Sequence, residues 1–285
     1  MQVVVVTLAH GTMPAVDPRS TFVVVLVASA GVAYAVLTVR TRSGIGIPST
    51  GRVVAFFGGL AAVAVVDVPL VAHAASERLS AHMAQHLLLW IVAPALLVMG
   101  RPGTVVMIGL PLPLRRRAHR IALSLRPITS LATHPAVVLV VSAGVIWAWH
   151  MPRAYQAAIN DGWLHAVEHV TFLGTAILLW SVLAGYAAHR RRRRPAVFGV
   201  AFATMVHSGW LGLVLSFADN VLYPVYASEP GALADQQLAG VLMWIPMALV
   251  YSAVAAALFF RWLSDMDRRV SANIDRPAVL SGDGR

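Results

Sequence analysis

Two pairs of histidines in the sequence repeat one spacing. His82 precedes His86 by four residues, and His165 precedes His169 by the same interval. Residues four apart on an α-helix lie on one face, with their Cβ atoms about 5–6 Å apart. If both segments are helical, each pair can therefore offer two imidazoles to a single metal ion.

Other side chains that bind metals lie towards the same end of the predicted helices as these pairs. A lone histidine at the end of a helix is ordinarily satisfied by a nearby carbonyl, so the prediction depends on the whole set. We predict a metal site formed by His82, His86, His150, His165, Glu168, His169 and His207. Residues that could add to this site are Asp67, His73, Met83, Met205, Asp235 and Met243.

The chemistry of these side chains favours copper. Imidazole binds copper, zinc, iron and nickel, whereas thioether sulfur selects the cuprous ion. Methionines lie near the histidines, although methionine is also a common filler of helix interfaces. Cysteine is absent, which excludes thiolate ligands, disulfides and a cysteine nucleophile. Copper is thus the predicted metal, with zinc or haem as alternatives.

The composition places these residues in a membrane protein. Hydrophobic residues make up 58% of the chain and charged residues 12%, against roughly 25% charged residues in soluble domains. A membrane-spanning helix needs an apolar run of about 17–25 residues. Seven such runs occur, at 21–39, 53–72, 82–99, 135–150, 163–186, 197–217 and 236–263. We therefore predict an all-α, polytopic membrane bundle with seven transmembrane helices.

The predicted bundle accounts for nearly the whole chain. One transmembrane domain covers residues 1–265, and we expect residues 266–285 to form a disordered cytoplasmic tail. The apolar stretch 104–112 is too short to span, and Pro111 interrupts it, so we expect it to lie in the interface or to dip back. No room remains for a soluble catalytic domain, and we expect a protein that is not an enzyme.

Arginines alternate between the connections that join the predicted helices. The first, third and fifth connections hold Arg40, Arg42, Arg52, Arg101, Arg115, Arg116, Arg117, Arg120, Arg126 and the run 190–194. The second and fourth hold only Arg78 and Arg153, and the sixth holds none. Because basic loops stay in the cytoplasm, we predict an N-terminus outside, a cytoplasmic C-terminus and an outward-facing histidine site. The same placement explains the net charge of +10 through contacts with anionic lipid, without a nucleic-acid partner.

Five segments carry a resemblance to a known family. They read, in order, HMAQHLLLWIVAPALLVMGRP, WAWHMP, HAVEH, MVHSGWLG and DQQLAGVLMWIP. Together they resemble the CtaG family of bacterial integral-membrane assembly factors for haem–copper cytochrome c oxidase, over residues 67–263. The motif residues that the resemblance carries over are His82, His86, His150, His165, Glu168, His169, His207, Asp235 and Gln236.

The resemblance implies a function as well as a location. It implies a non-catalytic, multi-pass protein of the bacterial cytoplasmic membrane that helps copper to reach the oxidase. The implied partners are the catalytic subunit of the oxidase, membrane lipid and other copper chaperones.

Three other functions fit parts of the pattern. The segment from His165 to His169 matches the H-x-x-E-H motif of inverted zinc peptidases, in which the glutamate activates a water on a zinc held by both histidines and a distant acid. Histidines on facing helices, such as His86 and His169, could instead bind the iron of a haem b from both sides. In a channel or transporter, Asp67 and Glu168 would line the pathway, but the two halves of the sequence show no inverted repeat.

The arginine pattern predicts the outcome of a reporter experiment. A reporter that is active only outside the cytoplasm should be active when fused after Ala227, in the sixth connection. The same reporter should be silent when placed within residues 190–194, because that arginine run holds its connection in the cytoplasm. Measured activities in the opposite order would place the histidines on the cytoplasmic side.

Overall fold

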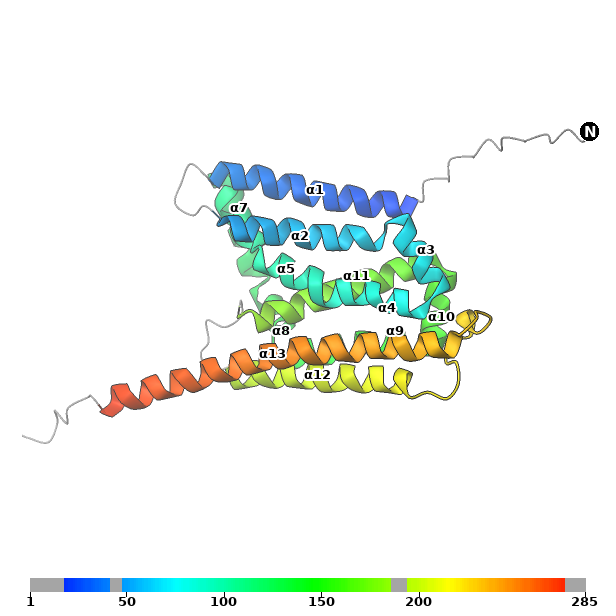
Figure 1. Cartoon of the computed structure of the whole chain (residues 1–285). Helices are drawn as coiled ribbons and strands as arrows, with labels where there is room; N and C mark the ends of the chain where they lie inside the picture. The colour runs from blue at the N-terminus through cyan, green and yellow to red at the C-terminus, as the bar shows by residue number, and fades with distance from the viewer. Residues whose placement is uncertain (1–17, 42–47, 186–193, 275–285) are drawn as a thin grey trace, which may run out of the picture.

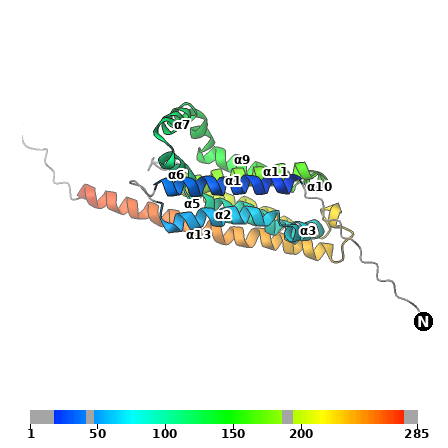
Figure 2. The same ribbon diagram turned by 90° about the horizontal axis from the view of Figure 1, so that it is seen from above.

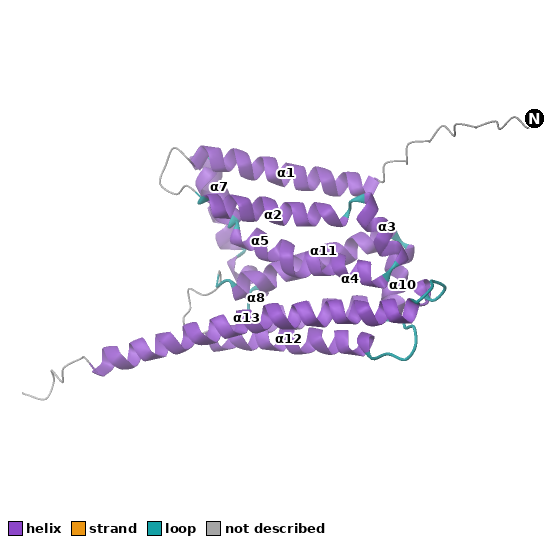
Figure 3. Cartoon of the chain, in the orientation of Figure 1, coloured by secondary structure: helices purple, strands orange, loops and turns teal. Residues whose placement is uncertain are grey.

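The structure is a computed structural model that describes residues 18–41, 48–185 and 194–274. Every regular element in these residues is a helix, as Figure 3 shows. The elements are α1 (Pro18–Thr41), α2 (Thr50–Val66), α3 (Pro69–Glu77), α4 (Leu79–Leu87), the π-helix η1 (Leu88–Val92), α5 (Ala93–Met99), α6 (Pro102–Gly109), α7 (Leu112–Ser124), α8 (Arg126–Ala132), α9 (Pro135–His150), α10 (Pro152–Asn160), α11 (Gly162–Leu183), α12 (Arg194–Ser216), the 3₁₀ helix η3 (Pro224–Tyr226) and α13 (Ala232–Ile274).

The helices meet the length and apolarity that a membrane requires. Within the described ranges, five helices qualify on their own, and the number rises to seven if two bent pairs each form one span. The bent pairs are α2 with α3, at 53°, and α8 with α9, at 63°. The prediction of an all-helical membrane protein is therefore confirmed, and the count of seven holds if both bent pairs cross the membrane.

Two predicted boundaries differ from the observed ones. The predicted span 53–72 contains a break, because α2 ends at Val66 and Pro69 starts α3 in its first turn, where its missing N–H costs nothing. At the other end of the chain, α13 continues past Asp265 to Ile274, so the predicted division at residue 265 falls within a helix. The remainder of the predicted tail, residues 275–285, lies outside the described residues, as do residues 190–193 of the arginine run.

The span that carries His82 and His86 contains the π-helical segment η1, which ends just before Pro94. Pro94 has no N–H, so it cannot donate the usual helical hydrogen bond to the carbonyl of Trp90. The indole nitrogen Nε1 of Trp180, on α11, donates to that carbonyl instead, at 3.0 Å. In a membrane interior, a neighbouring helix must satisfy such a freed backbone group. The contact also joins this span to α11.

The helices lie side by side, with α1 and α2 at one edge of the bundle and α12 and α13 at the other (Figure 1). The basic helix α7 lies at one end of the bundle, whereas α3 and α10 lie at the opposite end. Seen from above, α7 projects away from the other helices (Figure 2). Neither α7 nor α8 contains a buried residue. The structure thus keeps the arginine-rich connection apart from the end at which α4 and α11 begin.

The helices α12 and α13 approach each other closely, and two glycines make this approach possible. A Cβ atom on Gly240 would lie 2.5 Å from the backbone nitrogen of Ser216 and 2.6 Å from the carbonyl oxygen of Gly212. A Cβ atom on Gly212 would lie 2.7 Å from the Cβ of Trp244. Small residues at such crossings let membrane helices pack through van der Waals contact of their backbones.

Substitution of Gly240 should therefore separate these helices. We expect Gly240→Ala to lower the free energy of unfolding by about 1–3 kcal/mol, as overpacking does in other cores. Gly209→Ala, on α12, is the matched control, because a Cβ at Gly209 meets nothing within 4 Å. Circular dichroism during unfolding of the detergent-solubilised protein measures both variants, and equal stability of the two would contradict the close approach.

Candidate metal centre

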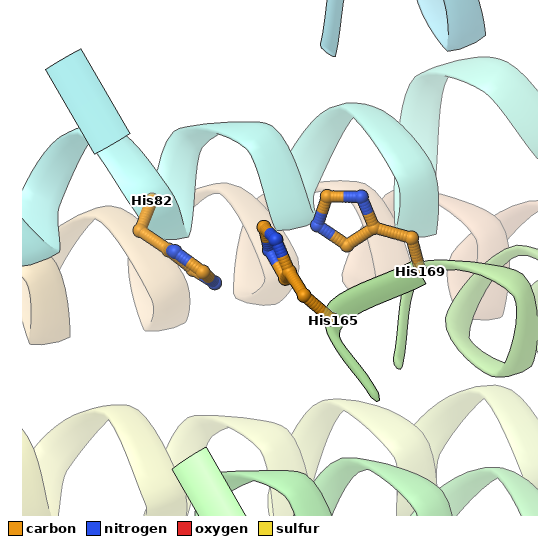
Figure 4. A group of neighbouring side chains, drawn as sticks. All are labelled: His82, His165 and His169. Carbon is orange, nitrogen blue, oxygen red and sulfur yellow. The ribbon is translucent and has the colours of Figure 1, made fainter. Parts of the chain in front are cut away.

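Two helices supply the core of the candidate site. His82 and His86 lie on α4, and His165, Glu168 and His169 lie on α11. Figure 4 shows His82 facing His165 and His169 across the gap between these helices. The predicted helical spacing is therefore correct for both pairs, and the two helix faces meet in the interior of the bundle.

The N-terminus of α11 is fixed by its capping residue. Asp161 accepts hydrogen bonds from the backbone nitrogens of Trp163, at 2.8 Å, and Leu164, at 3.2 Å. This is the usual bonding of an N-cap aspartate, which satisfies amide groups that have no partner in the first turn. The cap defines where α11 begins and therefore the face on which His165 and its neighbours lie.

The helix α4 is fixed by two side-chain contacts. Asp235, in the first turn of α13, accepts hydrogen bonds from both the backbone nitrogen and the hydroxyl group of Ser80. Further along α4, the side-chain nitrogen of Gln85 donates to the carbonyl oxygen of Val66 at 3.0 Å. That carbonyl is at the last residue of α2, where the helix leaves it without an intrahelical donor. These contacts set the position of α4, and with it those of His82 and His86.

One group of three ligands is buried. The Nε2 atoms of His82 and His86 are 2.9 Å apart, and the Nε2 of His86 lies 3.5 Å from an oxygen of Glu168. One ligand atom from each of the three residues can be chosen so that all lie within 4.8 Å of one another. Since metal–nitrogen bonds are about 2.0–2.1 Å, ligands of one ion lie up to about 4.2 Å apart. We call these three residues the buried group.

A second group of three ligands is more exposed and shares His82 with the first. It consists of His82, His165 and His169, and its ligand atoms also lie within 4.8 Å of one another. The ring centroids of His165 and His169 are 4.2 Å apart, and that of His82 lies 5.2 Å from the centroid of His165. His165 and His169 are half-buried, whereas His82 is fully buried. We call this set the half-buried group.

His150 lies beside the buried group in a defined tautomer. Its Nδ1 is 2.7 Å from the carbonyl oxygen of Ile146, and because a carbonyl can only accept, Nδ1 must carry the proton. The Nε2 atom then holds a lone pair, is buried and has no hydrogen-bond partner among the described residues. The ring centroids of His150 and His86 are 5.9 Å apart. A ring held by a backbone carbonyl in this way is typical of histidines that bind metals.

Besides His150 and Asp235, three predicted histidine and acidic ligands lie outside both groups. His207, on α12, belongs to neither group, although we expected it to converge with His86 and His169. His73 is exposed on α3, where its Nε2 lies 3.3 Å from a carboxylate oxygen of Glu77. Asp67 caps the C-terminus of α2, at the break in that span. The sequence predicts that these residues lie near the same end of the bundle. It does not predict whether the helix face that carries each residue points towards the site.

The predicted methionines take packing positions. Met83 and Met243 are buried in the main hydrophobic core, and Met205 packs against that core. The sulfur of Met205 accepts a hydrogen bond of 3.0 Å from the hydroxyl of Ser252, on α13. The alternative that we gave for methionine, as a filler of helix interfaces, describes these contacts.

Tyrosines near the site were not singled out from the sequence. The Tyr155 ring, on α10, lies with its centroid 5.1 Å from that of His82. Burial raises the pKa of the Tyr226 hydroxyl to about 12, so the hydroxyl keeps its proton and donates to the carbonyl oxygen of Ala75 at 2.9 Å. Because that proton is used, the Tyr155 hydroxyl must be the donor of the 2.9 Å bond to Tyr226.

A third tyrosine, Tyr223, forms a hydrogen bond with the backbone of His150. The hydroxyl of Tyr223 donates to the carbonyl oxygen of His150 at 2.9 Å. Tyr223 and Tyr226 both come from the connection between α12 and α13, which the side chain of Gln236 fixes by accepting from the Leu222 nitrogen at 2.6 Å. The cluster of tyrosines in this connection, LYPVY, was the only signal of this role in the sequence.

The contact between Asp235 and Ser80 can be tested by substitution. We expect Asp235→Ala to lower the free energy of unfolding by about 1.5–3 kcal/mol, the usual cost of a lost hydrogen bond to a charged group. Asp235→Asn should recover part of this loss, because the amide oxygen still accepts. Asp219→Ala, in the exposed connection after α12, serves as the control. Unfolding of the purified variants provides the measurement, and equal losses at both positions would refute a positioning role for Asp235.

Comparisons with known proteins identify the family. The family model described as "Cytochrome c oxidase caa3 assembly factor (Caa3_CtaG)" matches residues 32–265. Uncharacterized proteins of Mycobacterium bovis and Mycobacterium tuberculosis are each 28% identical over 243 residues, which cover 80% of this chain and 36% of theirs. A Mycobacterium leprae protein is 27% identical over 266 residues, covering 87% of this chain and 39% of its own.

The match to the relatives is confined to part of their length. This chain covers little more than a third of each of these curated relatives. No solved structure matches the sequence. The family match nevertheless extends across α4, α9, α11, α12 and most of α13, which hold every residue of the candidate metal centre. The chain therefore belongs to the Caa3_CtaG family of cytochrome c oxidase caa3 assembly factors.

Proposed function

We propose that this protein helps to mature a haem–copper cytochrome c oxidase by binding copper as its cargo and passing it on. The observation that carries the proposal is the buried group, in which two imidazoles and a carboxylate from two helices converge. The family supplies the oxidase as the destination. The protein would not change its cargo covalently, so its role is not that of an enzyme.

The charge of the buried group supports a cation. Glu168 has no exposed surface, and neither carboxylate oxygen has a hydrogen-bond partner in the part of the chain that the structure describes. An ionised carboxylate in such surroundings is costly unless a charge or a metal compensates it. A cation held by His82, His86 and Glu168 would supply that compensation.

The ligand types support copper but also accept other metals. Imidazole nitrogen binds divalent copper more strongly than zinc at a given site, and both ions accept a carboxylate. The methionines, which favoured copper in the sequence, pack in the core instead, so copper now depends on the imidazoles and on the oxidase family. In an inverted zinc peptidase, the glutamate of the H-x-x-E-H motif acts beside a zinc that both histidines of the motif hold. Here Glu168 belongs to the buried group, whereas His165 and His169 belong to the half-buried group, so the geometry does not support a peptidase.

The membrane setting of the proposal follows from the arginines. We place the protein in the bacterial cytoplasmic membrane as a multi-pass protein, with the N-terminus and the histidine end outside and the C-terminus in the cytoplasm. Copper chaperones outside the cell membrane would then be the donors, and the catalytic subunit of the oxidase would be the acceptor.

Copper binding can be measured directly on the purified protein. We expect the wild type to retain about one copper ion per chain after dialysis, and His82→Ala/His86→Ala to bind about 100-fold more weakly or worse, because removing direct ligands costs more than the 10–100-fold of outer-shell changes. His73→Ala is the matched control, since His73 lies on the exposed surface of α3. Retention of copper by the double variant would refute the proposed site.

The same variants test the biological role. A strain that lacks this protein should contain less active haem–copper oxidase, and the His82→Ala/His86→Ala protein should fail to restore it while the His73→Ala protein restores it. Added copper should partly offset the defect by mass action. A Soret band in the purified protein would instead show haem, and a strong preference for zinc over copper would assign the site to zinc.

A further inference from the structure

The two ligand groups share one residue, His82. Building on the proposed copper site, we infer that the protein carries its ion along a two-position relay, from the half-buried group to the buried group, with His82 as the ligand common to both. The relay determines how many ions are bound and in what order the histidines act. It goes beyond the proposed function, which requires only that an ion binds.

The shared histidine limits the site to one ion. A neutral imidazole has one N–H group and one nitrogen with a free lone pair. His82 can therefore serve the half-buried group or the buried group, but not both at once. The Nε2 atoms of His82 and His86 are only 2.9 Å apart, close enough for both rings to bind the same ion.

Burial and charge give the relay its direction. The side chains of His165 and His169 are partly exposed, although their Nε2 atoms are buried, whereas His86 and Glu168 are buried as whole residues. The half-buried group is therefore the nearer of the two to the surface of the bundle, and an ion that enters from there meets it first. The half-buried group consists of three neutral imidazoles, while the buried group replaces one imidazole with a carboxylate. A cation in an apolar interior is stabilised by that negative charge, so the buried group should hold the ion more tightly.

The distances allow the ion to pass from group to group by exchanging one ligand at a time. The ring centroid of His82 lies 5.2 Å from that of His165 and 4.3 Å from that of His86. The ion can therefore stay bound to His82 while His165 and His169 are replaced by His86 and Glu168. No bond within the protein is made or broken, and the oxidation state of the ion does not change. The Tyr155 ring also packs near His82, with the two ring centroids 5.1 Å apart.

Such a relay has a distinctive kinetic signature. If the half-buried group is an intermediate on the path, removing it slows entry and exit of the ion by the same factor and leaves the final affinity unchanged. If the buried group is the destination, weakening it speeds exit and lowers affinity without changing entry. A merely structural role of His165 and His169 would not produce this separation of rates from affinity.

The experiment follows cupric ion, delivered from a coloured chelator, into the whole chain in detergent. The chain contains no cysteine, so thiols do not compete for the ion. We expect His165→Ala/His169→Ala to slow both loading and release by about tenfold or more while the Kd stays within a few fold of wild type. We expect Glu168→Gln to load at the wild-type rate but to release faster, with a weaker Kd. His82→Ala should impair both positions, and His73→Ala neither.

Several results would overturn the relay. Two ions per wild-type chain would show that His82 does not limit occupancy, and wild-type loading rates in His165→Ala/His169→Ala would remove the half-buried group from the path. If the alanine variant does not fold, as judged by its helical circular dichroism, His165→Gln/His169→Gln replaces it.

The experiment also separates the relay from the proposed function. Failure of the wild type to bind copper at all would overturn both proposals. Normal copper binding, with loading and release rates that the variants leave unchanged, would overturn the relay alone.

Discussion

The constraint on which the structure depends is the burial of a carboxylate between two membrane helices. Glu168, on α11, has no exposed surface, and one of its carboxylate oxygens lies 3.5 Å from the Nε2 of His86 on α4. In such an interior, every charge and every backbone group must find compensation within the protein. The arrangement of the surrounding helices therefore has to be exact enough to bring the imidazoles of α4 to this carboxylate.

The contacts around α4 meet this requirement from three directions. Asp235 holds its first turn from α13, Gln85 joins it to the end of α2, and Trp180 satisfies the Trp90 carbonyl just beyond it. Two of these contacts use backbone groups that a break or a proline has freed. The break after α2 and the proline after η1 therefore free the carbonyl groups of Val66 and Trp90, and the hydrogen bonds to these carbonyls hold the helix that carries His82 and His86.

The sequence predicted part of this site and missed the rest for physical reasons. Helical spacing alone showed that His82 and His86 share a face, as do His165 and His169. It did not show that Glu168 turns towards the first pair or that His207 lies in neither group, because these facts depend on how helix faces rotate against one another. The bonds of Tyr226 likewise depend on partners far away in the chain. Composition predicted the membrane helices, since apolarity over one span is a local property.

The two helices α7 and α8 differ from the rest of the protein in burying no residue. The bundle therefore places no packing requirement on their side chains, and substitutions there leave the hydrophobic core intact. Leu114 and Ile121 are exposed on the same helix that carries Arg116 and Arg120. Changes of sequence in this segment can therefore alter how the protein meets the surrounding lipid without disturbing the packing around the candidate metal centre at the opposite end.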